Sequence, residues 1–219
     1  MIPEAMIFDM DGTLFQTETL TVPAYFACFE QLKREGLYRG ETPPVERFLG
    51  GLGLLLEEIW RRVLPDEPVA VHERANELLL QIQLDMLQKG VGQLYPVVAE
   101  TLAELHRRGI RLFVASNGLQ EYIEGVVAGK GLSPYFEGLY SAGKYSTRSK
   151  VELVRLLLDR HRLQSAWMVG DRSSDVEAGK RNGLLVVGCN YAGFGQAGEL
   201  DGADRLIESF GELLSLMKD

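Results

Sequence analysis

Residues 5–15 read AMIFDMDGTLF, and this stretch decides the fold. The apolar run from Ala5 to Phe8 is short, ends at Asp9 and is followed by Gly12, which predicts a buried strand that ends in a loop. Asp9 and Asp11 stand two positions apart, and side chains at that spacing point the same way in an extended segment. The stretch therefore predicts a buried strand with two carboxylates at its carboxyl end.

On the C-terminal side, strand-like and helix-like segments alternate from about residue 96 onward. Strands are predicted over 110–115, 139–142, 166–170, 184–188 and 205–207, helices over 97–108, 119–130, 149–162, 174–182 and up to 217, and a glycine-rich loop around 193–198. This alternation is typical of a parallel sheet with helices on both faces. We therefore expect an α/β fold.

Between these two parts, from about residue 21 to residue 93, the pattern is helical. Apolar residues recur at helical spacing in groups that end before Gly36, Pro65 and Gly90, and no convincing strand interrupts them. We therefore expect a helical insertion. Its segment FLGGLGLLL (48–56) fits either a loop that faces the active site or an interrupted helix.

Composition excludes several classes of partner. The chain has 219 residues, with 23 Lys plus Arg against 31 Asp plus Glu, for a net charge of -8. This balance argues against binding to nucleic acid or to an anionic membrane, but it allows a small anionic substrate. Apolar stretches fall short of the ~18 residues of a membrane span, and no targeting segment is visible, so we expect a cytoplasmic protein. Cys28 and Cys189 show no metal-binding spacing and are expected to be buried thiols. The sequence predicts no oligomeric state.

Polar residues follow the predicted strands, and ligands bind at the carboxyl ends of strands in such sheets. These residues are Asp9, Asp11 and Thr13 after the first strand, Ser116 and Asn117 after the strand at 110–115, and Asp171 and Asp175 after the strand at 166–170. Lys150 starts the helix that precedes the strand at 166–170. Several ionised carboxylates repel one another unless a cation compensates for their charge. Carboxylate and carbonyl oxygens suit Mg²⁺, and the lack of His or Cys near these positions in the sequence argues against zinc.

The spacing of Asp9 and Asp11 has a chemical meaning. One carboxylate can attack an electrophile while the other transfers a proton to or from the departing oxygen. Gly12 lets backbone N–H groups approach an anion closely. Together with a divalent cation and an ammonium group, this set suits phosphoryl transfer.

The ordered motifs DMDGT (9–13), SN (116–117), Lys150 and GDRSSD (170–175) resemble the haloacid dehalogenase-like superfamily, in particular its phosphatase branch and phosphoglycolate phosphatase-like members. The resemblance implies a Rossmann-like three-layer α/β/α core with a mostly parallel sheet, formed by residues 1–15 and 96–219. It also implies that residues 16–95 form a small inserted α-helical cap domain.

The resemblance implies a magnesium-dependent phosphatase that acts on a small phosphorylated metabolite. Asp9 would be the nucleophile that carries an aspartyl-phosphate, and Asp11 would be the acid and then the base. Lys150 would offset negative charge, and Ser116, Asn117 and the backbone of Gly12 would bind the phosphate. The Mg²⁺ ligands would be the Asp9 and Asp171 carboxylates and the Asp11 backbone carbonyl, with Asp175 acting directly or through water.

Two features depart from the usual pattern of these relatives. Lys150 is not followed by proline, and Lys144 is a rival for the same role, although Ser149-Lys150 is the better helix start. The predicted cap carries no charged specificity signature that is recognisable from the sequence. We also expect Arg172 and the three histidines, His72, His106 and His161, at the surface.

Other functions remain compatible with these motifs. A phosphomutase like β-phosphoglucomutase, a pyrophosphatase or a nucleotidase would use the same chemistry. A haloacid dehalogenase needs neither a metal nor Asp11, so the motifs argue against it. A non-catalytic binding protein on the same fold is an alternative of another class.

Overall fold

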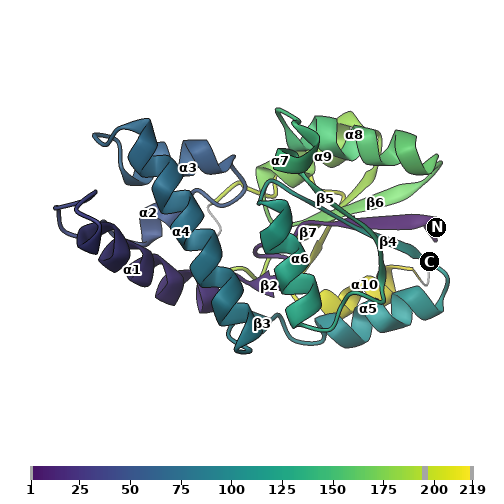
Figure 1. Ribbon diagram of the computed structural model, residues 1–219. Helices are drawn as coiled ribbons and strands as arrows, with labels where there is room; N and C mark the ends of the chain where they lie inside the picture. Colours follow the sequence, from purple (N-terminus) through teal and green to yellow (C-terminus); the bar gives the residue numbers. More distant parts are fainter. Residues whose placement is uncertain (1, 194–196, 218–219) are drawn as a thin grey trace.

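The computed structural model describes residues 2–193 and 197–217; residues 194–196 of the predicted glycine-rich loop lie outside the described residues. Six strands form one sheet in the order β5-β4-β1-β6-β7-β8, and all five pairings are parallel (Figure 1). The strands are β1 (Ala5–Phe8), β4 (Arg111–Ser116), β5 (Phe136–Ser141), β6 (Ala166–Gly170), β7 (Leu185–Cys189) and β8 (Arg205–Ile207). The predicted parallel sheet is thus confirmed.

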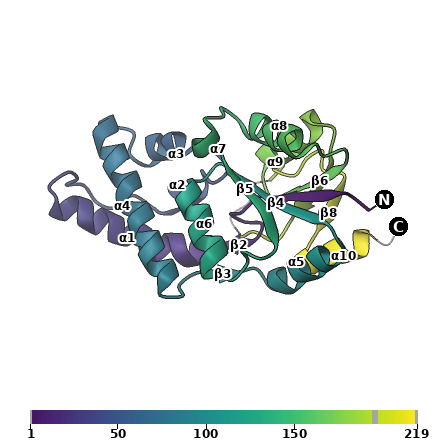
Figure 2. The ribbon, with the colours of Figure 1, turned by 45° about the vertical axis from the view of Figure 1, so that its right-hand side comes forward.

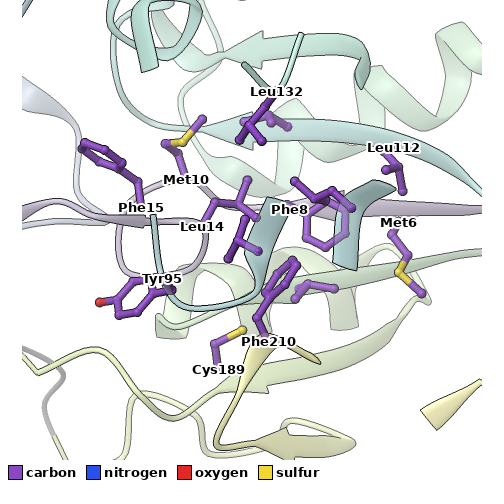
Figure 3. Close-up of a cluster of buried hydrophobic side chains, with 14 of the residues drawn as sticks. Met6, Phe8, Met10, Leu14, Phe15, Tyr95, Leu112, Leu132, Cys189 and Phe210 are labelled. Atoms are coloured by element: carbon purple, nitrogen blue, oxygen red, sulfur yellow. The ribbon is translucent and has the colours of Figure 1, made fainter. Parts of the chain in front are cut away.

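Helices cover both faces of this sheet, as Figure 2 shows. One face packs against α5 (Val98–Arg107), α6 (Gln120–Gly129) and α10 (Leu213–Leu216), and the other against α8 (Lys150–His161) and α9 (Ser173–Arg181). Successive residues of β1 alternate between the two cores, because side chains of a strand point to opposite faces in turn. Met6 and Phe8 belong to the first core, where Phe8 packs near Phe210 (Figure 3), and Ala5 and Ile7 belong to the second. The fold is the expected three-layer, Rossmann-like α/β/α arrangement.

A separate helical lobe lies beside the sheet (Figure 1). It comprises α1 (Glu18–Arg34), α2 (Glu46–Leu49), α3 (Leu56–Val63) and α4 (Val69–Gln88), and we call it the helical lobe. Its aromatic and aliphatic side chains form their own buried cluster, distinct from the two cores on the sheet. A protein segment that buries its own apolar faces in this way can hold a fixed shape over the sheet edge.

Short elements complete the chain. The antiparallel pair β2 (Phe15–Gln16) and β3 (Gln93–Leu94) joins the two chain segments that connect the helical lobe to the sheet. The sequence pattern gave no strand at 93–94, because two residues are too few to show a period. The remaining elements are α7 (Ala142–Tyr145) and the 3₁₀ turn η1 (Phe210–Glu212). No helix among the described residues has both the length and the apolar character that crossing a membrane requires.

The two cysteines and one of the histidines lie buried in the structure. Cys28 and Cys189 are free and buried, as expected. His72 is also buried, with its Nε2 atom 2.7 Å from the carbonyl oxygen of Leu64, so its expected surface position is wrong. The local pattern of charged neighbours indicated exposure, but the α3–α4 connection folds back over this histidine.

Candidate active site

The strand ends of the sheet bring the first set of polar residues together. Phe8, the last residue of β1, lies opposite Val114 of β4 and Val169 of β6. The backbone N–H of Asp9 still donates to the Val169 carbonyl oxygen, at 2.9 Å. The residues that follow these strands therefore emerge at the same edge of the sheet, where Asp9, Ser116 and Asp171 are buried.

Lys150 is the lysine that reaches Asp9. Its ammonium donates to Asp9 Oδ1 at 2.8 Å and to Asp175 Oδ1 at 2.6 Å, and the side chain is buried. Ser149 caps the start of α8 by accepting from the N–H of Glu152, which fixes the helix end that carries Lys150. Lys144 is exposed, and its Nζ atom lies 5.9 Å from the centroid of the Tyr145 ring.

Three carboxylates converge next to this lysine. One oxygen from each of Asp9, Asp171 and Asp175 lies within 4.8 Å of the others. The N–H of Arg172 donates to Asp175 Oδ2 at 3.0 Å, and Thr13 Oγ1 donates to Asp171 Oδ1 at 3.0 Å. Asp171 Oδ2 is buried and has no hydrogen-bond partner within residues 2–193 and 197–217. A buried oxygen of this kind is an available ligand for a cation.

Two glycines make this convergence sterically possible. A Cβ atom on Gly12 would lie 2.3 Å from Asp171 Oδ2, and Gly12 also has a φ of +83°. A Cβ atom on Gly170 would lie 2.2 Å from Asp175 Cγ. No side chain larger than hydrogen fits at either position without moving a carboxylate, so DMDGT and GDRSSD are coupled through space.

Asp11 is held apart from the other three carboxylates. Its Oδ1 atom accepts hydrogen bonds from Thr17 Oγ1 at 2.7 Å and from the Tyr122 hydroxyl at 2.6 Å. Burial, and then the negative charge of Asp9, raise the pKa of Asp11 to about 6, against the opposing effect of the two hydroxyl donors. A carboxyl group with that pKa can both give and take a proton near neutral pH.

The remaining charges leave the site short of positive charge. Burial raises the pKa of Asp175 to about 6, and burial and the neighbouring Asp9 raise the pKa of Asp171 well above its usual value. Burial opposes the charge of Lys150, but Asp175 and Asp9 together hold its pKa above the ordinary range. In this group the carboxylates of Asp9, Asp171 and Asp175 face the cations Lys150 and Arg172, and Arg172 also pairs with Glu199. The group therefore carries excess negative charge, which a divalent cation would offset. The donor set is all oxygen and fits Mg²⁺.

A cavity opens above this group, between the sheet edge and the helical lobe. It contains about 620 Å³ of empty space, partly open to solvent, and Asp9, Asp11, Lys150 and Ser116 line its floor. The hydroxyl of Ser116 accepts from the N–H of Gly118 at 3.0 Å. Residues of both the sheet edge and the helical lobe line the cavity, so a molecule bound there would contact both.

Asn117 lines the cavity and also contacts the helical lobe. Its Nδ2 atom donates to the carbonyl oxygen of Gly53 at 2.8 Å, so the amide links the sheet edge to the α2–α3 loop of the helical lobe. Gly53 lines the cavity, and residues 50–55 form the loop between α2 and α3. Of the two interpretations of FLGGLGLLL, the loop that faces the site is therefore correct.

Sequence reasoning missed three residues that shape this site. Thr17 and Tyr122 hold Asp11, and no motif marks either of them, because their contacts depend on how α1 and α6 pack. Arg172 was expected at the surface and is buried, so that expectation is wrong. Its guanidinium donates to Glu199 Oε1 and to the carbonyl oxygen of Leu49 in the helical lobe, each at 3.2 Å.

Known proteins resemble the whole chain. It is 26% identical to a phosphoglycolate phosphatase of Vibrio vulnificus over 96% of this chain and 94% of the relative, and 28% identical to a 5′-nucleotidase of Pseudomonas aeruginosa over 89% and 86%. It is also 27% identical to the pyrophosphatase PpaX of Bacillus velezensis over 97% of this chain and 95% of the relative.

Solved structures agree with these relatives. The crystal structure of CbbY from Rhodobacter sphaeroides in complex with phosphate matches with a TM-score of 0.82 and 26% identity, and covers 97% of this chain and 96% of that one. Residues 3–183, most of the chain, match the family described as haloacid dehalogenase-like hydrolase. The protein therefore belongs to the haloacid dehalogenase-like hydrolases.

Proposed function

We propose that the protein is a magnesium-dependent phosphatase that hydrolyses a small phosphate monoester through an aspartyl-phosphate on Asp9. The observation that carries the proposal is the meeting of the Asp9, Asp171 and Asp175 carboxylates within 4.8 Å beside the Lys150 ammonium, next to a cavity that Asp9 and Lys150 line. The names of the similar proteins, a phosphoglycolate phosphatase, a nucleotidase and a pyrophosphatase, support phosphate-ester or phosphoanhydride hydrolysis.

In the first half-reaction, a carboxylate oxygen of Asp9 forms a bond to phosphorus while the bond from phosphorus to the alcohol oxygen breaks. Asp11 gives its proton to that alcohol oxygen, so the alcohol leaves neutral. In the second half-reaction, Asp11 takes a proton from a water molecule, the water oxygen bonds to phosphorus, and the bond to Asp9 breaks. Inorganic phosphate leaves, and both aspartates return to their starting states.

The other residues would hold charge in place. Lys150 donates to Asp9 and would face the phosphoryl oxygens, and Ser116 with the backbone of Gly12 and Asn117 would bind the same oxygens. The carboxylates of Asp9, Asp171 and Asp175 and the carbonyl of Asp11 would hold Mg²⁺. When bound, Mg²⁺ neutralises negative charge on the phosphoryl group.

The helical lobe would act as a cap over this site. We assign it to residues 16–95, with residues 1–15 and 96–219 as the catalytic core; the β2–β3 pair lies at the two junctions. Closure over the cavity would exclude bulk water and macromolecular substrates. The cytoplasmic location expected from the sequence stays a prediction.

Turnover of p-nitrophenyl phosphate with and without Mg²⁺ tests the proposal. We expect release of inorganic phosphate that requires the metal and falls by several orders of magnitude in Asp9→Asn, with the fold retained by circular dichroism. Normal activity in Asp9→Asn would remove the nucleophile assignment. Conversion of a sugar phosphate into its isomer, with no free phosphate, would indicate a phosphomutase instead.

A further inference from the structure

The part of the cavity that faces the helical lobe carries no formal charge. Its walls include six apolar side chains from α2, α3, α4 and the α2–α3 loop: Phe48, Leu52, Leu54, Ile59, Leu79 and Leu80. We call this part the lobe chamber. Among the described residues that line the whole cavity, Lys150 is the one cation, and it is already paired with Asp9 and Asp175 on the floor.

Two arginines line a cavity next to the lobe chamber and do not line the chamber itself. Arg62 and Arg172 line a second, neighbouring cavity, and the two cavities share Leu52, Gly53 and Leu54. The shared loop is tied to the sheet edge by Asn117 at Gly53, and Arg62 donates to the carbonyl oxygen of Gly50 at 3.3 Å. The arginines therefore hold the loop in place from outside and do not enter the lobe chamber.

The chamber offers a few neutral polar groups. Asn76 uses its oxygen to accept from the Trp60 indole at 3.3 Å, and Gln83 uses its nitrogen to donate to Thr21 at 3.1 Å. The amide nitrogen of Asn76 and the side-chain oxygens of Gln83 and Asn117 are therefore among the donors and acceptors left for a bound molecule. These groups can orient an uncharged alcohol but cannot neutralise an anion.

We infer that the leaving group of the substrate is an uncharged alcohol with an apolar body, and not one that carries a carboxylate or a second phosphate. A second anionic group would lose part of its water in the lobe chamber and find no cation on the chamber walls, which is unfavourable. An aliphatic or aromatic body gains from contact with the six apolar side chains. The inference rests on the proposed phosphatase function and names its substrate class.

A matched pair of esters provides the test. Benzyl phosphate and 4-carboxybenzyl phosphate differ by one carboxylate at the end that would enter the lobe chamber. We expect kcat/KM for benzyl phosphate to exceed that of the carboxylated ester by at least about 100-fold, or about 2.7 kcal/mol. Equal or faster turnover of the carboxylated ester, or of phosphoglycolate, would overturn the inference.

A nucleotide provides a third arm, because a nucleoside is uncharged but rich in polar groups. We expect adenosine 5′-monophosphate to be a poorer substrate than benzyl phosphate. A higher kcat/KM for the nucleotide would overturn the apolar part of the inference and assign the chamber to a nucleoside.

Placing a cation in the chamber should weaken the preference for benzyl phosphate. The variant Leu80→Lys should lower the ratio of kcat/KM for benzyl phosphate to kcat/KM for 4-carboxybenzyl phosphate at least tenfold. Leu54→Lys, at a residue that is already 38% exposed, should have the same effect. Leu37→Lys adds the same charge at an exposed position of the helical lobe that does not line the cavity, and should leave the ratio unchanged. A ratio unaffected by both chamber variants in folded protein would contradict the inference.

Binding separates this inference from the proposed function. The affinities of both benzyl esters for Asp9→Asn with Mg²⁺, measured by calorimetry, should rank in the same order as kcat/KM. If no ester is hydrolysed by the unmodified protein yet benzyl phosphate still binds more tightly, the proposed chemistry fails and the chamber assignment stands. If hydrolysis occurs and the ranking is reversed, the chamber assignment fails alone.

Discussion

The floor of the cavity and the lobe chamber above it are built from opposite kinds of side chain. The floor concentrates the buried Asp9 and Lys150 with the half-buried Asp11, while the chamber wall is apolar with a few neutral polar groups. Charged groups of this density stabilise a transition state only where the backbone holds them rigidly. The apolar wall belongs to a lobe with its own core. Under the proposed function, chemistry and selectivity would reside in separate parts of the chain, and changing one should leave the other in place.

The largest effect should come from breaking the floor at its cation. Lys150→Met leaves Asp9 and Asp175 without their shared donor and should lower kcat/KM by about 10²–10³-fold, the size expected for one lost charge-stabilising donor. Steady-state kinetics with Mg²⁺ measure this. Lys144→Met is the matched control at the exposed rival lysine and should keep near-normal activity. Equal losses of kcat/KM in the two variants would show that Lys150 has no specific role in the reaction. Lys150→Arg, which keeps the charge, separates a folding defect from a catalytic one.

A glycine comparison sharpens the role of backbone geometry in the floor. Gly12→Ala should raise the Mg²⁺ concentration needed for half-maximal activity about 10- to 100-fold, because its Cβ would displace the Asp171 carboxylate. Gly36→Ala is the control: φ is +73° there too, but no atom within 4 Å meets the new methyl group. It should lose only about 1–2 kcal/mol to backbone strain and keep the same metal requirement. A similar metal requirement in both variants would exclude the steric explanation.

Enlarging the chamber should affect binding more than chemistry. Leu79→Ala removes one apolar wall and should raise KM for benzyl phosphate about tenfold, with kcat within about threefold of normal. Leu78→Ala removes a neighbouring buried leucine of α4 that does not line the cavity. Both variants should lose about 2–5 kcal/mol of stability, but only Leu79→Ala should change KM. A fall in kcat alone would show that the two regions are not independent.

Removing a hydroxyl donor tests how the floor tunes Asp11. Tyr122→Phe deletes the 2.6 Å hydrogen bond to Asp11 Oδ1 and should lower kcat about three- to tenfold. That bond favours the carboxylate, so its loss raises the pKa of Asp11 further and should move the alkaline limb of the pH–rate profile to higher pH. Tyr135→Phe, at a tyrosine outside the cavity, should leave the profile in place. A shift to lower pH would contradict the assignment.

The smallest effect concerns stability of the metal-free protein. The pKa of Asp11 is about 6 in the folded protein, above its ordinary value of 3.8. The protonated carboxyl therefore contributes fully to the free energy of unfolding below pH 3.8, and this contribution is lost as the pH rises through about 6. Asp11→Asn avoids charging this group and should melt a few degrees higher than the unmodified protein at pH 8, with no such gain at pH 3.5. Thermal unfolding with a chelator at both pH values measures this. A higher melting temperature of Asp11→Asn at pH 3.5 alone would contradict a raised pKa of Asp11.

Much of the fold could be predicted because it depends on short-range patterns. The apolar runs of β1, β4, β6 and β7 and the helical segments between them indicated a parallel sheet, and the sheet has that form. The two-residue strands β2 and β3 were missed because such short pairs depend on where the chain returns. Arg172 and His72 were misplaced because burial of a long polar side chain depends on what covers it. Here the end of α2 contacts Arg172, and the α3–α4 connection contacts His72.

The sequence by itself determined the chemistry-bearing set, because the register of a parallel sheet places whatever follows Phe8 and Gly170 at one edge. The tertiary structure alone decided that Lys150 reaches Asp9, that Tyr122 and Thr17 hold Asp11, and that Asn117 is directed to Gly53. It also decided that the wall of the lobe chamber is uncharged. Lys150 and Asp9, for example, are 141 positions apart in the sequence. Local propensity carries no information about contacts at such separations.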